Sequence, residues 1–287
     1  MLPTPLVVPP LPLPWPGAEP TLVAALLGAC VGSFLNVVVW RVPREESVLW
    51  PSSHCPRCGT TLSWLENIPV LSWLGLRGRC RHCHAPISPR YPLTELLCAG
   101  LWVLMTVARP AGLGPQPDEL LVVIAGWLLV SLLLVLALID GDQLWIPEPI
   151  CRWGVVAGWL VTAGVGWQQS AARGREVLAA HLLAAALGLI GFDLLRVGGS
   201  RWLGRPAMGS GDGKVAALLG AWLGLTGLAL ASFVAILLAA LVGGLALATG
   251  AIQRQQPIPF VPFLAAGGIV VWVTGASPWL RLALGQG

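Results

Sequence analysis

The chain has 287 residues, of which 56% are hydrophobic and 10% are charged, and its formal net charge is +4. This composition excludes an ordinary soluble domain and indicates a polytopic membrane protein. The basic residues gather in loops on one side of the predicted membrane helices, which accounts for the positive charge, so we expect no nucleic-acid partner.

The first twenty residues contain eight prolines and no lysine or arginine. A secretory signal peptide has a basic start and an apolar segment without proline. We therefore predict a short disordered or polyproline-like leader over 1–20. The first transmembrane helix is expected directly after it, over 21–40.

The apolar runs predict about eight transmembrane helices, each near the ~20 residues that a bilayer requires. Only Ala231-Ser232 separates the sixth from the seventh, so seven helices remain an alternative. The predicted fold is an all-α polytopic membrane protein with one small loop domain over 41–90. The expected spans are 21–40, 91–108, 119–139, 149–167, 177–195, 215–231, 233–250 and 262–282.

Basic residues indicate the orientation of these helices. Thirteen lysines and arginines lie in the loops on one side, and four lie on the other. The richer side is expected to face the cytoplasm, which places the N-terminus outside. Its loops cover 41–90, 140–152, 196–214 and 251–258.

The loop over 41–90 carries two CxxC pairs, Cys55 with Cys58 and Cys80 with Cys83, separated by 21 residues. Two such pairs at this separation predict a tetrahedral zinc site. Disulfides are the alternative, but they are rare in the reducing cytoplasm. Four thiolates leave no coordination position open, so the zinc is expected to be structural.

Two aspartates lie where a membrane chain tolerates them least. Asp140 ends an apolar run, and Asp212 stands in Gly209-Ser210-Gly211-Asp212-Gly213-Lys214, just before another. Carboxylates at the margin of hydrocarbon are costly and usually functional. Two of them held together share one proton and can activate water, as in aspartic proteases. The glycines allow close backbone approach, and Lys214, the only lysine, is expected to support the site.

Three further acidic residues give weaker indications of a function. Asp142 is interpreted as a solvent-side residue that supports Asp140, because a metal-binding acidic pair would want more acids at helical spacing. Glu95 falls about one turn inside the second span and is expected to pair with an arginine or to reach the interface. Glu148 follows Pro147 at the start of the fourth span.

These motifs together resemble the bacterial prepilin peptidases, or type IV leader peptidases, which are membrane aspartic proteases of the GxGD kind. Two departures are modest: Glu148 stands where the family usually has aspartate, and Val261 where it commonly has glycine. The matching segments, from the first span to near the C-terminus, are Gly32-Ser33-Phe34-Leu35-Asn36-Val37-Val38, Arg41-Val42-Pro43, both CxxC pairs, Asn67-Ile68-Pro69, Arg90-Tyr91-Pro92-Leu93-Thr94-Glu95-Leu96, Asp140 with Pro147, Gly209-x-Gly211-Asp212-x-Lys214, and Pro257-Ile258-Pro259-Phe260.

The resemblance implies an enzyme of the bacterial inner membrane that cleaves the leader of type IV prepilins and type II secretion pseudopilins. The cut falls after a glycine at the cytoplasmic face, with Asp140 and Asp212 as the catalytic pair in a peptidase domain over 91–287. For many members it also implies N-methylation of the new N-terminus from S-adenosylmethionine. No glycine-rich strand–helix loop would cradle the adenosine, so we attach this activity, as a hypothesis, to the zinc-bearing loop and Asn36. A homo-oligomer is left open.

Two functions of other classes remain as alternatives. A membrane thiol oxidoreductase would use the CxxC pairs on the oxidising side and would not need the aspartates. A non-enzymatic pilus assembly or transport component would use buried acids for protons, but a transporter places such acids near the bilayer midplane.

Overall fold

The computed structural model describes residues 18–108, 119–206, 208–253 and 256–276. In these ranges the chain is helical apart from loops and two isolated β-bridges, which confirms the predicted all-α fold. Most of the predicted leader over 1–20 and the end of the last predicted span lie outside the described residues.

The helices follow the predicted apolar runs. Five described stretches are long and apolar enough to cross a membrane, and they correspond to α1, α4, α5, α6 and α7. Two 3-10 turns, η1 (Val42–Arg44) and η2 (Trp64–Asn67), lie in the loop after α1. The α-helices are α1 (Ala18–Arg41), α2 (Leu71–Gly75), α3 (Arg90–Val107), α4 (Glu119–Gln143), α5 (Glu148–Gln169), α6 (Ala171–Leu203), α7 (Asp212–Ala248) and α8 (Val261–Thr274).

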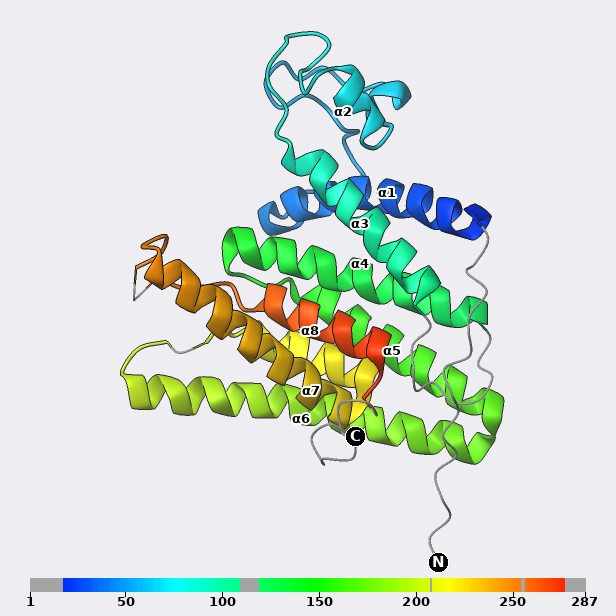
Figure 1. The fold of residues 1–287 in the computed structure, drawn as a ribbon, viewed down its shortest axis with the longest axis vertical. Helices are drawn as coiled ribbons and strands as arrows, with labels where there is room; N and C mark the ends of the chain where they lie inside the picture. Colours follow the sequence, from blue (N-terminus) through cyan, green and yellow to red (C-terminus); the bar gives the residue numbers. More distant parts are fainter. Residues whose placement is uncertain (1–17, 109–118, 207, 254–255, 277–287) are drawn as a thin grey trace, which may run out of the picture.

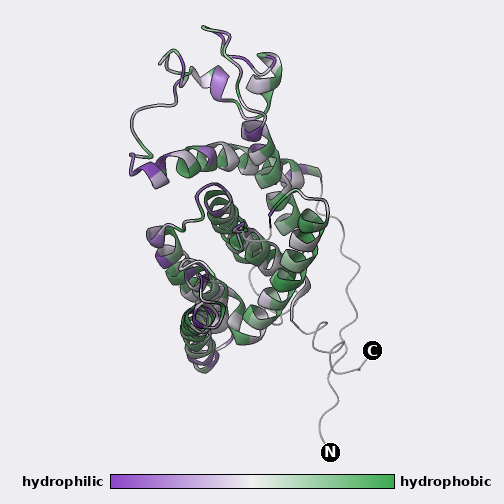
Figure 2. Ribbon diagram, turned by 90° about the vertical axis from the view of Figure 1, so that its left-hand side faces the viewer, coloured by the Kyte–Doolittle hydropathy of each residue, from purple (hydrophilic) through white to green (hydrophobic). Residues whose placement is uncertain are grey.

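The molecule has two layers of helices and a projecting loop (Figure 1). Helices α1 and α3 pack on each other and lie against α4, and α8 lies between α4 and α7. The loop with the four cysteines projects beyond α1 and α3. Figure 2 shows hydrophilic residues concentrated in this loop and at helix ends, with hydrophobic residues along the helices. This distribution is the one expected of helices that face lipid.

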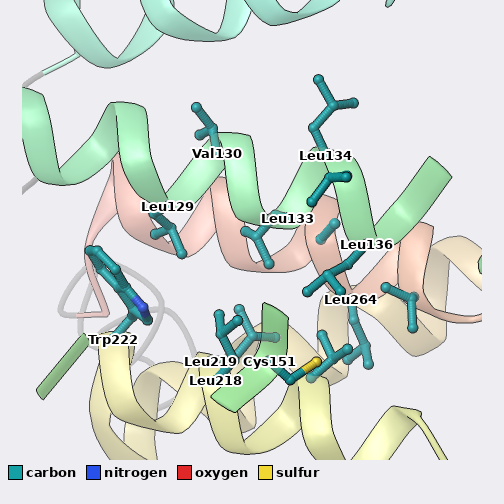
Figure 3. Packing of buried hydrophobic residues seen from close by; sticks show 14 of the residues in the cluster. Leu129, Val130, Leu133, Leu134, Leu136, Cys151, Leu218, Leu219, Trp222 and Leu264 are labelled. Carbon is teal, nitrogen blue, oxygen red and sulfur yellow. The ribbon is translucent and has the colours of Figure 1, made fainter. Parts of the chain in front are cut away.

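Leucines from three helices form the centre of the larger layer. Figure 3 shows Leu133 of α4, Leu219 of α7 and Leu264 of α8 filling the space between these helices. All three side chains are fully buried. Trp222 is also buried here, and its indole nitrogen donates to the carbonyl of Gly154 on α5 at 2.9 Å. The helices that carry the two aspartates therefore share one packed core.

The long helix α7 is interrupted at Gly224. Its φ of 67° and ψ of −177° lie in a region that is essentially restricted to glycine. One turn before the interruption, the carbonyl of Ala221 accepts a hydrogen bond from Nδ1 of His181 on α6, at 2.9 Å. Helix α7 thus consists of a first arm, 212–223, and a second arm, 225–248, seen as its yellow and orange parts in Figure 1.

Neighbouring helices show that the chain reverses direction between the two arms. In the first arm, Leu218 and Trp222 lie against Gly154 and Gly158 of α5, so both helices run the same way. In the second arm, Gly227 and Ala231 lie against Val271 and Gly267 of α8, so those helices run in opposite directions. Helix α8 runs the same way as the first arm, because Gly268 lies against Leu219 while Val261, at the start of α8, donates to Asp140, whose charge acts on Asp212. The two arms are therefore antiparallel to each other.

Counting the two arms separately, the described chain has eight apolar helical stretches, in agreement with the predicted number. The boundary between the sixth and seventh lies at Gly224 and not at Ala231-Ser232. The sequence prediction placed it wrongly because a reversal of this kind needs a glycine conformation and not a break in hydrophobicity.

Candidate active site

The two predicted aspartates lie close together at one end of the bundle. Asp140 is in the last turn of α4 and is 6% exposed, and Asp212 begins α7 and is 4% exposed. Their charges are close enough to interact directly. Two interacting carboxyl groups that are shielded from bulk solvent cannot both ionise readily, so the arrangement favours a single proton on the pair.

The register of three helices explains how these residues meet. A Cβ added at Gly268 of α8 would lie 2.6 Å from Leu219 of α7 and 3.4 Å from Leu133 of α4. These three positions therefore form one layer of the core. Seven residues make about two helical turns, which returns each helix to the same face. Asp140, Asp212 and Val261 each lie seven residues from the layer position of their own helix, and all three lie toward the same end of the bundle.

Backbone amides hold both carboxylates. The amide of Val261, at the start of α8, donates to Oδ2 of Asp140 at 3.0 Å. The amide of Gly209 donates to Oδ2 of Asp212 at 3.1 Å. The first N–H groups of a helix have no partner within the helix, so the start of α8 offers a donor that orients the carboxyl group of Asp140. The sequence could not indicate Val261, since its contribution is a main-chain N–H that every residue except proline carries.

Gly211 joins the segments that carry the two aspartates. A Cβ at this position would lie 2.6 Å from Cβ of Ile146, which follows α4. Any side chain at 211 would push these segments apart. Gly209 has more space, because its added Cβ would lie 3.4 Å from Oδ2 of Asp212. The close approach predicted for this glycine-rich motif is thus found at Gly211.

Two ion pairs surround the aspartates. Lys214, predicted to support the site, pairs with Glu148 at the start of α5, with Nζ and Oε2 3.4 Å apart. Asp142 is not simply a solvent-side residue: its two carboxylate oxygens accept from the guanidinium of Arg90 at 2.8 and 2.6 Å. Neither partner was identified from the sequence, because charge alone does not show which loops are neighbours.

The four predicted cysteine ligands lie together. Their sulfur atoms are all within 4.8 Å of one another, so the cluster can hold a metal ion. Hydrogen bonds with the side chain and the backbone of Thr60 lower the pKa of the Cys58 thiol to about 6, which favours the metal-binding thiolate. All seven cysteines of the chain are described, and none forms a disulfide.

The two CxxC segments repeat one backbone pattern with a spacing of 25 residues. The amide of Cys55 donates to the carbonyl of Thr60 at 2.9 Å, and the amide of Cys80 donates to that of Ala85 at 2.9 Å. The fifth residue of each segment has a left-handed conformation: Gly59 has φ 71° and His84 has φ 56°. Each segment is a tight turn that presents two thiols to the same point.

Polar contacts connect this loop to α3, and α3 to α1. Glu95 of α3 is buried, and its Oε2 accepts from the amide of Val70 at 2.7 Å, so it fastens the loop and does not reach the interface. Asn36 of α1 donates to the carbonyl of Tyr91 at 3.2 Å.

An open cavity of about 260 Å³ lies between α1 and the loop, lined by Cys30, Ser33, Phe34, Val37, Ser53, Asn67 and Pro69.

Comparison with known protein families gives two adjacent matches. Residues 26–109 match the bacterial peptidase A24 N-terminal domain, and residues 127–247 match the type IV leader peptidase family. The first match covers most of α1, the cysteine-bearing loop and α3. The second includes both aspartates.

Relatives of known name cover most of the chain. A prepilin leader peptidase/N-methyltransferase of Burkholderia pseudomallei is 35% identical over 90% of this chain and 87% of its own length. One of Bacillus subtilis is 32% identical over 91% of this chain and 98% of its own length. One of Myxococcus xanthus is 42% identical over 69% of this chain, and the match spans 54% of that relative's length. No solved structure matches the chain.

Proposed function

The chain belongs to the type IV leader peptidase family, and from this premise we propose that it is a membrane aspartic endopeptidase that removes the leader peptide of type IV prepilins. The observation that carries the proposal is the pair of buried carboxylates, Asp140 and Asp212, held at one level between α4, α7 and α8. The peptidase is assigned to residues 91–287.

The proposed mechanism is general acid–base hydrolysis without a covalent intermediate. The pair shares one proton; the ionised carboxylate takes a proton from water, which attacks the scissile carbonyl, and the protonated one donates to the developing oxyanion. The amides of Val261 and Gly209 keep both carboxylates oriented for this exchange. Gly209, Gly211 and Lys214 act as supporting residues.

The proposed substrates are type IV prepilins and type II secretion pseudopilins, cut after a glycine at the cytoplasmic face of the bacterial inner membrane. Relatives are named as prepilin leader peptidases, and the predicted loops on the side of the aspartates carry thirteen of the seventeen lysines and arginines, as cytoplasmic loops do. An apolar pilin helix would lie in the bilayer while its charged leader stays in the cytoplasm.

Prepilin processing tests the function directly. In cells that co-express a prepilin, Asp140→Ala and Asp212→Ala, made separately, are each expected to leave the precursor uncut while the enzyme remains folded. Loss of either catalytic carboxylate removes proton transfer, and rates should fall by at least about 10²-fold. Mass spectrometry of the pilin reports leader loss. Asp193→Ala on α6, which removes an exposed acid paired with Arg196, is the control and should process normally.

Retained processing in either active-site variant would contradict the peptidase assignment. Labelling of the loop cysteines from outside intact cells by a membrane-impermeant thiol reagent would favour a thiol oxidoreductase. Binding of the precursor without any mass change would favour a non-enzymatic assembly component.

We propose that the cysteine cluster holds a structural zinc ion. A zinc–sulfur distance of about 2.3 Å in a tetrahedron places the sulfur atoms roughly 3.8 Å apart. Sγ of Cys55 and Sγ of Cys83 are 3.8 Å apart, which is the separation expected of two zinc ligands, and all four sulfur atoms lie within 4.8 Å of one another.

Metal analysis of the purified protein checks this proposal. Wild type should contain close to one zinc ion per chain, and Cys83→Ser should lose most of it, since three thiolates bind zinc far more weakly than four. Cys30→Ser, which changes an exposed cysteine of α1, is the matched control and should keep its zinc. Equal zinc in both variants would remove Cys83 from the ligand set.

N-methylation of the new N-terminus from S-adenosylmethionine is proposed on the names of the relatives. Asn36, which the sequence linked hypothetically to this activity, donates a hydrogen bond to the carbonyl of Tyr91. The cavity between α1 and the loop is lined by residues without negative charge, so nothing there pairs with the cationic sulfur of the methyl donor. The donor does not fit the described residues well enough to derive a methylation step. The same mass spectra would reveal an added methyl group.

A further inference from the structure

Arg90 and Asp142 connect the two family-matched parts of the chain. Arg90 begins α3, directly after the cysteine-bearing loop, and Asp142 lies two residues after Asp140 in the last turn of α4. Nη1 and Nη2 of Arg90 donate to Oδ1 and Oδ2 of Asp142 at 2.8 and 2.6 Å. Two parallel bonds between planar groups specify distance and angle together, which a single contact does not.

A contribution to the stability of the fold does not account for the ion pair between Arg90 and Asp142. The two side chains are 44% and 32% exposed, and ion pairs with such exposure usually contribute little to folding. The position of the pair is more informative. Helix α4 ends at Gln143, and Leu144, with φ 51°, turns the chain away. Terminal turns of helices fray, and this one contains Asp140.

The terminal turn of α4 has limited support from its own helix. Its closing hydrogen bond runs from the amide of Leu144 to the carbonyl of Asp140, at 2.9 Å. If this turn opened, Asp140 would lose its direction toward the amide of Val261. The guanidinium of Arg90 holds Asp142 from outside the helix and so keeps the turn closed.

Arg90 is itself held by the cysteine-bearing part. The next residue, Tyr91, accepts a hydrogen bond from Asn36 of α1, and Glu95, just over one turn later, accepts from Val70 of the loop. The start of α3 is therefore fixed by α1 and by the loop. Through the ion pair between Arg90 and Asp142, the start of α3 in turn fixes the position of the last turn of α4.

We propose that Arg90 and Asp142 are a positioning pair that holds Asp140 in catalytic geometry and makes peptidase activity depend on the folded cysteine-bearing loop. The inference rests on the proposed peptidase function. Neither residue touches the reacting atoms; both act through the last turn of α4.

Charge reversal in the full-length enzyme tests the proposal. Arg90→Asp, Asp142→Arg and the double variant are reconstituted in lipid vesicles with a purified prepilin. Each single variant should lose about 10- to 100-fold in kcat, because small displacements of catalytic groups have effects of this size. KM should change little, since the pair does not contact substrate. The double variant should recover most of the lost rate, which a general loss of stability would not do.

Two further variants keep the test decisive. Arg90→Lys retains the charge without the two-bond geometry and should show an intermediate kcat, even if the reversed singles fold poorly. Reversal of Arg196 and Asp193, an ion pair on α6 with similar exposure and an N–O distance of 3.1 Å, should leave kcat unchanged. Folding is followed through thermal melting and zinc content.

The outcomes separate this inference from the proposed function. A wild-type enzyme that fails to cleave prepilin overturns both. The positioning role alone is overturned if the wild type cleaves prepilin and the single variants keep the wild-type kcat. It is also overturned if the wild type cleaves and the double variant is no faster than the single variants.

Discussion

At the residue scale, small differences in space decide whether the aspartates can meet. Gly211 has no room for a side chain because Ile146 occupies the place of its Cβ, whereas Gly191 of α6 faces open space. The same residue type thus serves a structural need at one position and none at the other. The contact at Gly211 sets the separation between the segment after α4 and the start of α7.

Gly211→Ala should therefore impair activity more than it impairs folding. Overpacking costs about 1–3 kcal/mol, and a displacement of the aspartates by a fraction of an ångström should lower the cleavage rate by about 10- to 100-fold. Cleavage of reconstituted prepilin and thermal unfolding in detergent measure the two effects. Gly191→Ala is the matched control and should change neither, so equal rates for both variants would show that the Gly211 contact is unimportant.

At the element scale, the two arms of α7 differ in length. At 1.5 Å per residue the first arm extends about 18 Å and the second about 36 Å from the reversal at Gly224. A bilayer core is about 30 Å thick. The first arm therefore ends well short of the end of the second arm. Asp212, which begins the first arm, lies about 18 Å from the reversal, level with Asp140 and with the start of α8.

Gly224→Ala should disturb this hairpin of helices. The backbone at Gly224 is essentially restricted to glycine, so a side chain there is expected to cost about 1–3 kcal/mol. Unfolding in detergent, followed by circular dichroism, should show a lower midpoint than wild type. Gly244→Ala in the second arm, where an added Cβ meets nothing, serves as the control. A midpoint shared by both variants would argue against the reversal.

At the scale of the whole molecule, eight membrane passages require the segments between helices to alternate between the two sides. Under the proposed orientation, the ends after α4, α6 and the second arm of α7 share the cytoplasmic side with the cysteine-bearing loop. The reversal at Gly224 and the turn at Ser170 face the opposite side.

Reporter fusions check this topology. Alkaline phosphatase, which is active only outside the cytoplasm, should be active when fused after Ser170 or after Leu225 and inactive when fused after Arg205 or after Gln253. A cytoplasmic fluorescent reporter at the same positions should give the complementary pattern. Activity after Arg205, or inactivity after Leu225, would contradict the eight-passage arrangement.

Much of the site could be predicted from the sequence because its chemistry is local. Acidic residues beside apolar runs are costly, which identifies Asp140 and Asp212, and the CxxC spacing identifies Cys55, Cys58, Cys80 and Cys83. The structure brings the members of each set close together. Their catalytic and zinc-binding roles stay predictions. The partners Arg90, Glu148 and Ile146 could not be predicted. Each lies in a segment far along the chain from the residue it contacts, and its residue type is common.

The sequence by itself determined the membrane class and the helical content, because the cost of burying polar groups in lipid restricts composition and order directly. The ordered motifs determined the family. Only the tertiary structure decided where α7 reverses, which amides hold the carboxylates and which charges pair. These depend on packing among α4, α7 and α8 over more than a hundred residues of sequence, and packing is settled by the shapes of all neighbours together.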